Sequence, residues 1–182
     1  EPDAIALLLP FRPKGERFVL FVHPKNPTLE IWQGSRCGIE GAVKFFGADI
    51  AHPIDEFSVR LGDYLVGCES IAFRVGKHPK VQEIVLGNWS AQLDLSASRG
   101  SSPYSLVAPC PLLHQLRLRK EPEELDRMRE AARISVEAHE LARSLTRPGM
   151  NERDIQAVIE KHFLEQGAGG PAYGSIVAAG DN

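Results

Sequence analysis

Residues 39–75, IEGAVKFFGADIAHPIDEFSVRLGDYLVGCESIAFRV, decide the class of fold. Apolar side chains recur at helical spacing over residues 39–46 and again over residues 57–65. Each of these runs is followed by a short apolar run, residues 48–54 and 70–75, that is typical of a strand. Strands that alternate with helices of about ten residues indicate an α/β layer fold.

The chain on either side of this stretch continues the alternation. Residues 4–9 and 17–22 are predicted as two strands, because both are apolar and a turn with proline and glycine separates them. Residues 29–32 are predicted as a third short strand, and residues 81–89 as a further helix. We therefore expect a sheet that is packed against several helices.

The composition changes between residues 96 and 111, where serine, glycine and proline are frequent. We interpret this stretch as a connection and place a domain boundary near Leu116, which gives units of residues 1–115 and 116–182.

Two helices are predicted in the second unit. The first begins at Pro122, since a proline in the first turn loses no hydrogen bond, and it ends at residues 147–149. The second begins after Asn151, which forms a capping-box pattern with Asp154, and it ends at Gly167. Small and apolar residues within 171–180 are predicted to form a strand.

Composition excludes several classes of protein. The 182 residues carry a formal net charge of −3, so a nucleic-acid or anionic-membrane partner is not expected. The three cysteines show no CxxC spacing, which argues against a zinc knuckle and favours a reducing cytoplasm. The longest apolar run is far too short to span a bilayer.

A search for catalytic motifs finds no HExxH, GxSxG, P-loop or GxGxxG pattern, and the histidines are scattered singly. Two features remain, Trp32 between Glu30 and Gly34, and the residues from 171 to 180. Each has an ordinary structural interpretation, as a core aromatic and as a buried strand, and the residue pattern alone does not choose.

Five stretches, in order and at fitting intervals, resemble the bacterial Xaa-Pro aminopeptidases (aminopeptidase P), which are related to prolidase and creatinase. They are Glu1-Pro2-Asp3-Ala4, Glu30-Ile31-Trp32-Gln33-Gly34-Ser35-Arg36, Leu116-Arg117-Leu118-Arg119-Lys120 with Pro122-Glu123-Glu124, Arg147-Pro148-Gly149-Met150 with Glu152, and Gly167-Ala168 with residues 173–182.

The resemblance implies a mixed-sheet creatinase/prolidase-type N-terminal domain at residues 1–115 that lacks its first segment, followed by the incomplete start of a pita-bread metallopeptidase domain at residues 116–182. It also implies that two divalent metal ions, Mn²⁺ or similar, activate a hydroxide that attacks the peptide bond before proline. The expected partners are peptides with proline in second position and further copies of the chain, as a dimer or tetramer.

The resemblance also places the metal ligands beyond Asn182, and no two aspartates of this chain have the spacing of the family's ligand pair. We therefore expect a fragment that holds no metal ligand and no catalytic residue and that is inactive alone. Three positions correspond to substrate-binding residues. Tyr173 and Ile176 are expected on the pocket floor beside the metals, and Trp32 is expected to overhang the pocket of a neighbouring subunit.

Alternative functions remain. One is a prolidase, which cleaves only Xaa-Pro dipeptides, although the 30–36 motif favours the aminopeptidase. Another is a metal-free pita-bread module that binds a peptide or a protein. A free-standing α/β interaction domain is disfavoured, because two extra helices would leave apolar faces unburied.

Overall fold

The computed structural model describes residues 3–99 and 102–180. It divides the chain into two compact units, Glu1–Pro111 and Leu112–Asn182. The boundary expected between residues 115 and 116 lies four residues earlier, between Pro111 and Leu112, inside helix α5 (Cys110–Leu118). Glu1 and Pro2 of the first motif, and Asp181 and Asn182 of the last, lie outside the described residues.

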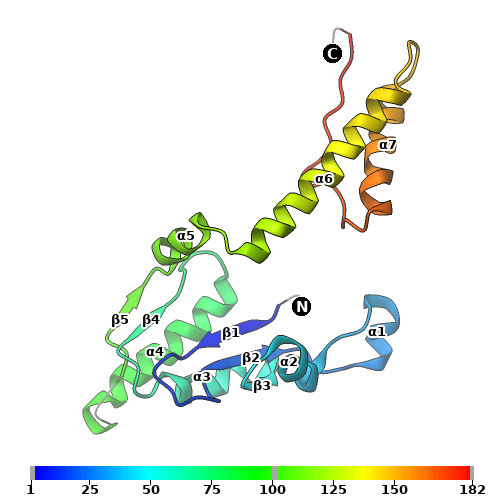
Figure 1. The fold of residues 1–182 in the computed structure, drawn as a ribbon. Helices are drawn as coiled ribbons and strands as arrows, with labels where there is room; N and C mark the ends of the chain where they lie inside the picture. Colours follow the sequence, from blue (N-terminus) through cyan, green and yellow to red (C-terminus); the bar gives the residue numbers. More distant parts are fainter. Residues whose placement is uncertain (1–2, 100–101, 181–182) are drawn as a thin grey trace. The chain divides into compact units, whose positions relative to one another are not determined.

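The first unit contains a mixed sheet of three strands (Figure 1). Strands β1 (Ile5–Leu8) and β2 (Phe18–Val22) form an antiparallel hairpin, whose turn includes Gly15 at φ 94°. Strand β3 (Ile50–Pro53) pairs with β2 in parallel. Helix α2 (Gly38–Phe46) provides the connection that a parallel pair requires.

A second, parallel pair of strands joins β4 (Ser70–Ala72) to β5 (Ser105–Val107). The long helix α4 (Pro79–Arg99) connects these two strands and packs against α3 (Phe57–Leu65), which follows the short 3₁₀ helix η1 (Ile54–Glu56). The indole Nε1 of Trp89 on α4 donates a hydrogen bond of 2.6 Å to the carbonyl of Pro103, just before β5. This bond attaches the end of the connection to the helix.

The core of this unit lies between the three-stranded sheet and helices α3 and α4. Val19 and Phe21 alternate along β2 and are fully buried, as expected for one face of a strand. Phe57 on α3 is also buried, and its ring meets that of Phe21 edge to face at 5.2 Å. The remaining buried members of the cluster are Leu9, Leu61, Leu65 and Val85.

The second unit consists mainly of two helices, α6 (Pro122–Leu145) and α7 (Glu152–Glu165), that pack along each other (Figure 1). The predicted capping box is confirmed, since Asn151 accepts from the backbone N–H of Arg153 and Asp154 accepts from that of Asn151. Ile134, Ala138 and Ala142 recur every four residues along α6 and are its buried positions. Small residues in two of the three places permit close packing.

Three predictions about secondary structure are wrong. Residues 29–32 form part of helix α1 (Pro27–Gln33), because Asn26 caps its N-terminus and Pro27 suits the first turn. Within residues 96–111, interpreted as a connection only, lie the end of α4, strand β5 and the start of α5. The predicted strand within 171–180 is extended but irregular, because no strand among the described residues pairs with it.

No helix of the described part of the chain is both long enough and apolar enough to cross a membrane.

Candidate functional site

The residues after α7 form one wall of a groove in the second unit. We name residues 168–180 the post-helix segment. The groove has a volume of about 410 Å³, and its lining combines this segment with side chains of α6 and α7. Its members are Ala131, Ile134, Ser135, His139, Ile159, Phe163, Ala168, Gly170, Pro171, Ala172, Tyr173, Ser175, Ile176 and Val177.

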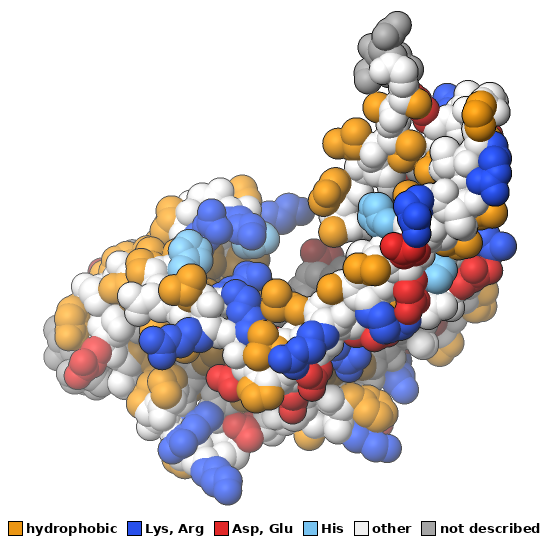
Figure 2. Space-filling model, turned by 45° about the horizontal axis from the view of Figure 1, so that its top comes forward, with side chains coloured by type: hydrophobic (Ala, Val, Ile, Leu, Met, Phe, Trp, Pro, Cys, Tyr) orange, Lys and Arg blue, Asp and Glu red, His pale blue; other side chains and the backbone are white. Residues whose placement is uncertain are grey.

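Tyr173 and Ile176 both line this groove, so the structure brings together the two site residues that were predicted in this unit. Both are strongly exposed, at 77% for Tyr173 and 87% for Ile176. Such exposure argues against the interpretation of this stretch as a buried strand. Figure 2 shows hydrophobic side chains at the surface over much of the molecule, in among charged ones.

Two carboxylates of α7 hold the post-helix segment. The hydroxyl of Ser175 donates a hydrogen bond of 2.7 Å to Oε1 of Glu160, and the backbone N–H of Ala179 donates one of 2.7 Å to Oε1 of Glu152. The amide of Gln156, one turn before Glu160, donates to the same Oε1 at 2.8 Å. The hydrogen bonds from Gln156 and Ser175 lower the pKa of Glu160, since both favour its ionised form.

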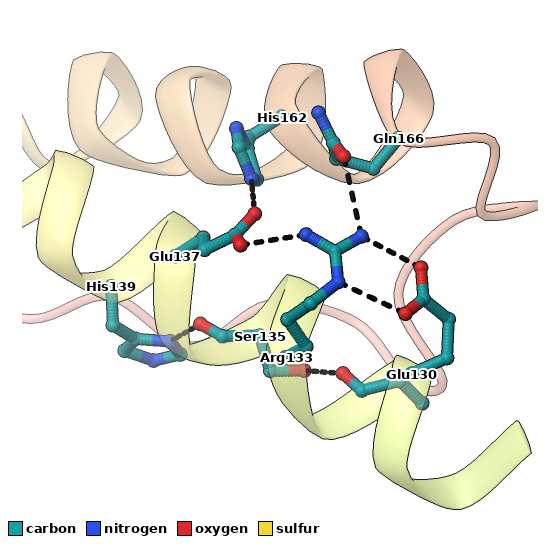
Figure 3. Close-up of polar contacts among 8 residues, drawn as sticks. Glu130, Arg133, Ser135, Glu137, His139, His162 and Gln166 are labelled. Atoms are coloured by element: carbon teal, nitrogen blue, oxygen red, sulfur yellow. Dashed lines mark hydrogen bonds and ion pairs between the residues drawn. The ribbon is translucent and has the colours of Figure 1, made fainter. Parts of the chain in front are cut away.

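A charged cluster joins α6 to α7 outside the groove lining (Figure 3). The Arg133 guanidinium donates to Glu130 on one side and to Glu137 on the other, at distances from 2.6 to 2.9 Å. Glu137 in turn lies 3.5 Å from Nε2 of His162 on α7, and Gln166 accepts from Arg133 at 3.4 Å. The bonds from Arg133 lower the pKa of both glutamates.

His139 shares the groove with Tyr173, and its Nδ1 lies 2.7 Å from the carbonyl oxygen of Ser135 one turn earlier (Figure 3). A carbonyl oxygen can only accept a hydrogen bond, so this contact requires a proton on Nδ1.

Trp32 lies in the other unit, on α1, and is 86% exposed. The interpretation of Trp32 as a core aromatic is therefore wrong. Gly34, at φ 84°, ends the helix, and its N–H donates to the carbonyl of Glu30. α1 has no buried residue, so it presents the indole without packing around it.

The loop after α1 borders a cleft of about 730 Å³, lined by Asp3, His23, Gln33, Gly34, Ser35, Arg36, Cys37 and Phe46. The guanidinium of Arg36 donates a hydrogen bond of 2.8 Å to Oε1 of Gln33, and no ion pair of Arg36 occurs within residues 3–99 and 102–180.

The described residues do not form a metal centre. No group of three or more His, Cys, Asp or Glu side chains among them is placed to hold a metal ion.

Comparison with known proteins defines the class of both units. Residues 1–72 match the family "Aminopeptidase P, N-terminal domain", and residues 126–182 match "Metallopeptidase family M24". The two matches follow each other in the expected order, and the predicted resemblance to aminopeptidase P is confirmed.

Particular relatives agree with this assignment. The chain is 31% identical to the Xaa-Pro aminopeptidase of Escherichia coli and 32% identical to that of Haemophilus influenzae, in both cases over its whole length. Among solved structures, it superposes on Pseudomonas aeruginosa aminopeptidase PepP with a TM-score of 0.89 and 35% identity, over 98% of this chain and 40% of the other. The chain spans about 41% and 40% of the two curated relatives.

Sequence reasoning missed the polar attachment of the post-helix segment. Glu152 and Ser175 were both quoted within motifs, but nothing in the sequence pairs either of them with its partner. Such a pairing depends on how the chain turns back after α7, where Gly167 and Gly170 take φ values of 81° and 135°. The two glycines were the available signal for that reversal.

Proposed function

We propose that the protein containing this chain is a metal-dependent Xaa-Pro aminopeptidase, which releases the N-terminal residue from peptides with proline in second position. The observation that carries the proposal is the full-length match of this chain to Xaa-Pro aminopeptidases, with the same fold as aminopeptidase PepP. Its N-terminal domain would extend over residues 1–115 and its metallopeptidase domain would begin at residue 116.

In this proposal, Tyr173 and Ile176 form the floor of the substrate pocket. Their support is the groove that they line and the exposure of both side chains. An exposed branched aliphatic side chain suits a proline ring, because both are apolar and the contact removes their surfaces from water. The phenol of Tyr173 adds a donor and acceptor beside it.

Trp32 is proposed to cover the substrate pocket of a neighbouring subunit in a homo-oligomer, a dimer or a tetramer. The support is an indole that is 86% exposed on a helix without buried residues. A flat aromatic face packs well against a proline ring. Trp32→Ala should then raise the KM for a proline peptide several-fold, whereas Ile31→Ala, at the neighbouring exposed position, should not.

The metals are proposed to be two Mn²⁺ ions, held by residues outside this chain. Family M24 is a metallopeptidase family, and mixed carboxylate and imidazole ligands suit Mn²⁺. A cytoplasmic location is proposed from the three cysteines, whose number is odd and whose spacing includes no CxxC. Neither a nucleic acid nor a membrane is proposed as a partner, given the net charge of −3.

The test is peptidase activity of the complete protein with added Mn²⁺ on three peptides, an Xaa-Pro-Xaa tripeptide, its Xaa-Ala-Xaa counterpart and an Xaa-Pro dipeptide. We expect release of the first residue from the proline tripeptide only, and its loss on chelation. Cleavage of the dipeptide alone would instead establish a prolidase. No turnover, in a protein shown to bind no metal, would establish a binding module.

A further inference from the structure

The post-helix segment runs along α7 in the opposite direction and is attached to it at two places. Ser175 is hydrogen-bonded to Glu160, and Ala179 is hydrogen-bonded to Glu152. Ala179 lies four residues after Ser175 in the segment, whereas Glu152 lies eight residues before Glu160 in α7. Eight helical residues span about 12 Å and four extended residues span about 13 Å, so the two spacings match. The attachment points are therefore in register without distortion of the helix or of the segment.

Ile176 lies between these two attachment points. Side chains of an extended segment alternate in direction, and here Ser175 and Val177 are half-buried whereas Ile176 and Ala178 are exposed. The bond from Ser175 to Glu160 thus directs one side chain toward α7 and its neighbour Ile176 away from it. The side chain of Ile176 itself is 87% exposed, so packing of that side chain does not fix its position.

Glu160 is itself oriented. Gln156, one turn earlier on α7, donates to the same oxygen as Ser175, and the pKa of Glu160 is lowered by the two hydrogen bonds. The carboxylate is therefore ionised at neutral pH and is a fixed acceptor for the hydroxyl.

We propose that Glu160 and Glu152 are positioning residues, which hold the post-helix segment at Ser175 and Ala179 so that Ile176 is presented in a fixed place to the proline ring of the substrate. The proposal rests on the proposed function, because it assigns the substrate contact to Ile176. Neither glutamate touches substrate in this account.

The first test replaces Ser175 in the complete protein and measures KM and kcat for an Xaa-Pro-Xaa tripeptide. Ser175→Ala should raise KM about threefold to tenfold, the factor that corresponds to one hydrogen bond, and should change kcat less than about twofold. Ser175→Thr, which retains the hydroxyl donor, should restore KM. Ser144→Ala, at an exposed serine whose hydroxyl bonds only within α6, is the matched control and should change nothing.

A double substitution identifies the partner. If Ser175 acts through Glu160, the KM of the Ser175→Ala, Glu160→Gln double variant should equal that of the poorer single variant. The melting temperature of Ser175→Ala should stay within about 2 °C of the wild type. The proposal would be overturned by an unchanged KM in Ser175→Ala or by multiplicative effects on KM in the double variant. It would also be overturned if activity fell only because the variant had lost stability.

A second readout does not depend on activity. Amide hydrogen exchange at Ala179 should be slowed in the complete protein and should accelerate at least about tenfold in Glu152→Ala, because its acceptor is removed. Unchanged exchange at Ala179 would overturn the attachment even in an active enzyme. Conversely, slowed exchange in a protein that cleaves no proline peptide would refute the proposed function and the role of Ile176 while leaving the attachment intact.

Discussion

The two units of the chain bury their apolar side chains to different extents, although both also expose some large ones. In the first unit, Val19, Phe21 and Phe57 are buried between a sheet and two helices. In the second unit, the buried apolar positions are those of α6, whereas Tyr173 and Ile176 are among its most exposed large side chains. The buried side chains of the first unit stabilise its fold. Tyr173 and Ile176 form an exposed apolar surface on the post-helix segment, which hydrogen bonds to Glu160 and Glu152 hold in place.

This difference makes the groove of the C-terminal unit a place to look for function. Apolar residues that are buried satisfy the hydrophobic effect within the unit itself. Apolar residues that are exposed together beside a groove indicate contact with something else.

The largest expected effect is on the core of the first unit. Phe21→Ala should lower the free energy of unfolding by about 3–5 kcal/mol, because it removes a fully buried ring and leaves a cavity. Phe45→Ala, at a ring that is 70% exposed, should change it by less than about 0.5 kcal/mol. Guanidinium denaturation followed by circular dichroism measures both, and equal effects would contradict the assignment of the core.

The contact surface of α6 should respond to overpacking. Ala138 is fully buried there, so Ala138→Leu should cost about 1–3 kcal/mol. Ala132→Leu, on the exposed side of the same helix, should cost less than about 0.5 kcal/mol. Thermal unfolding of the two variants compares the two positions directly, and a stabilising Ala138→Leu would show that the site contains unfilled space.

The two asparagine caps should differ. Asn151→Ala should cost about 1 kcal/mol, since it caps α7, a helix that packs on α6. Asn26 caps α1, which has no buried residue and should unfold locally, so Asn26→Ala should alter global unfolding by less than about 0.5 kcal/mol. If urea denaturation shows that Asn26→Ala lowers the free energy of unfolding by more than this, α1 belongs to the part of the fold that unfolds cooperatively.

The smallest effect is electrostatic and depends on pH. Arg133 lowers the pKa of Glu130 and Glu137 in the folded state, so the stability that these pairs contribute is present at pH values above the ordinary carboxylate pKa of 4.5. It is lost as the pH falls through the lowered values. The Arg133→Gln variant should therefore be slightly less stable than the wild type at pH 7. The stabilities of the two proteins should become equal well below pH 4.5.

The matched control for this comparison is Arg129→Gln. Among the described residues Arg129 pairs with Asp126, and both side chains are largely exposed, so its removal should change the stability at pH 7 by little. Unfolding midpoints measured from pH 3 to pH 7 would contradict the account if the Arg133 and Arg129 variants behaved alike.

Local sequence signals predicted most of the secondary structure. The Asn151–Asp154 capping box and the apolar spacing over 57–65 depend on neighbours in the chain, and both are found as expected. The strand predicted over residues 29–32 is wrong, because a short apolar run favours a strand by composition. Asn26 and Pro27, just before this run, instead specify the start of a helix.

The candidate site was predictable only in part. Tyr173, Ile176 and Trp32 were singled out through a resemblance, and their exposure could not be derived from residue type, since each is a side chain that is usually buried. The contacts of Ser175 with Glu160 and of Ala179 with Glu152 join residues that are 15 and 27 positions apart. Such long-range contacts follow from the chain reversal after α7 and not from any local pattern.

The most direct test of this account compares Ile176 with an equally apolar control. Ile176→Ala should raise the KM of the complete protein for an Xaa-Pro-Xaa peptide several-fold without lowering its melting temperature, because the side chain serves a ligand and not the core. Leu164→Ala, at a side chain of α7 that is 61% exposed and does not line the groove, should change neither quantity. An unchanged KM for Ile176→Ala, or a loss of stability in its place, would contradict the claim that this exposed segment is a substrate-binding surface.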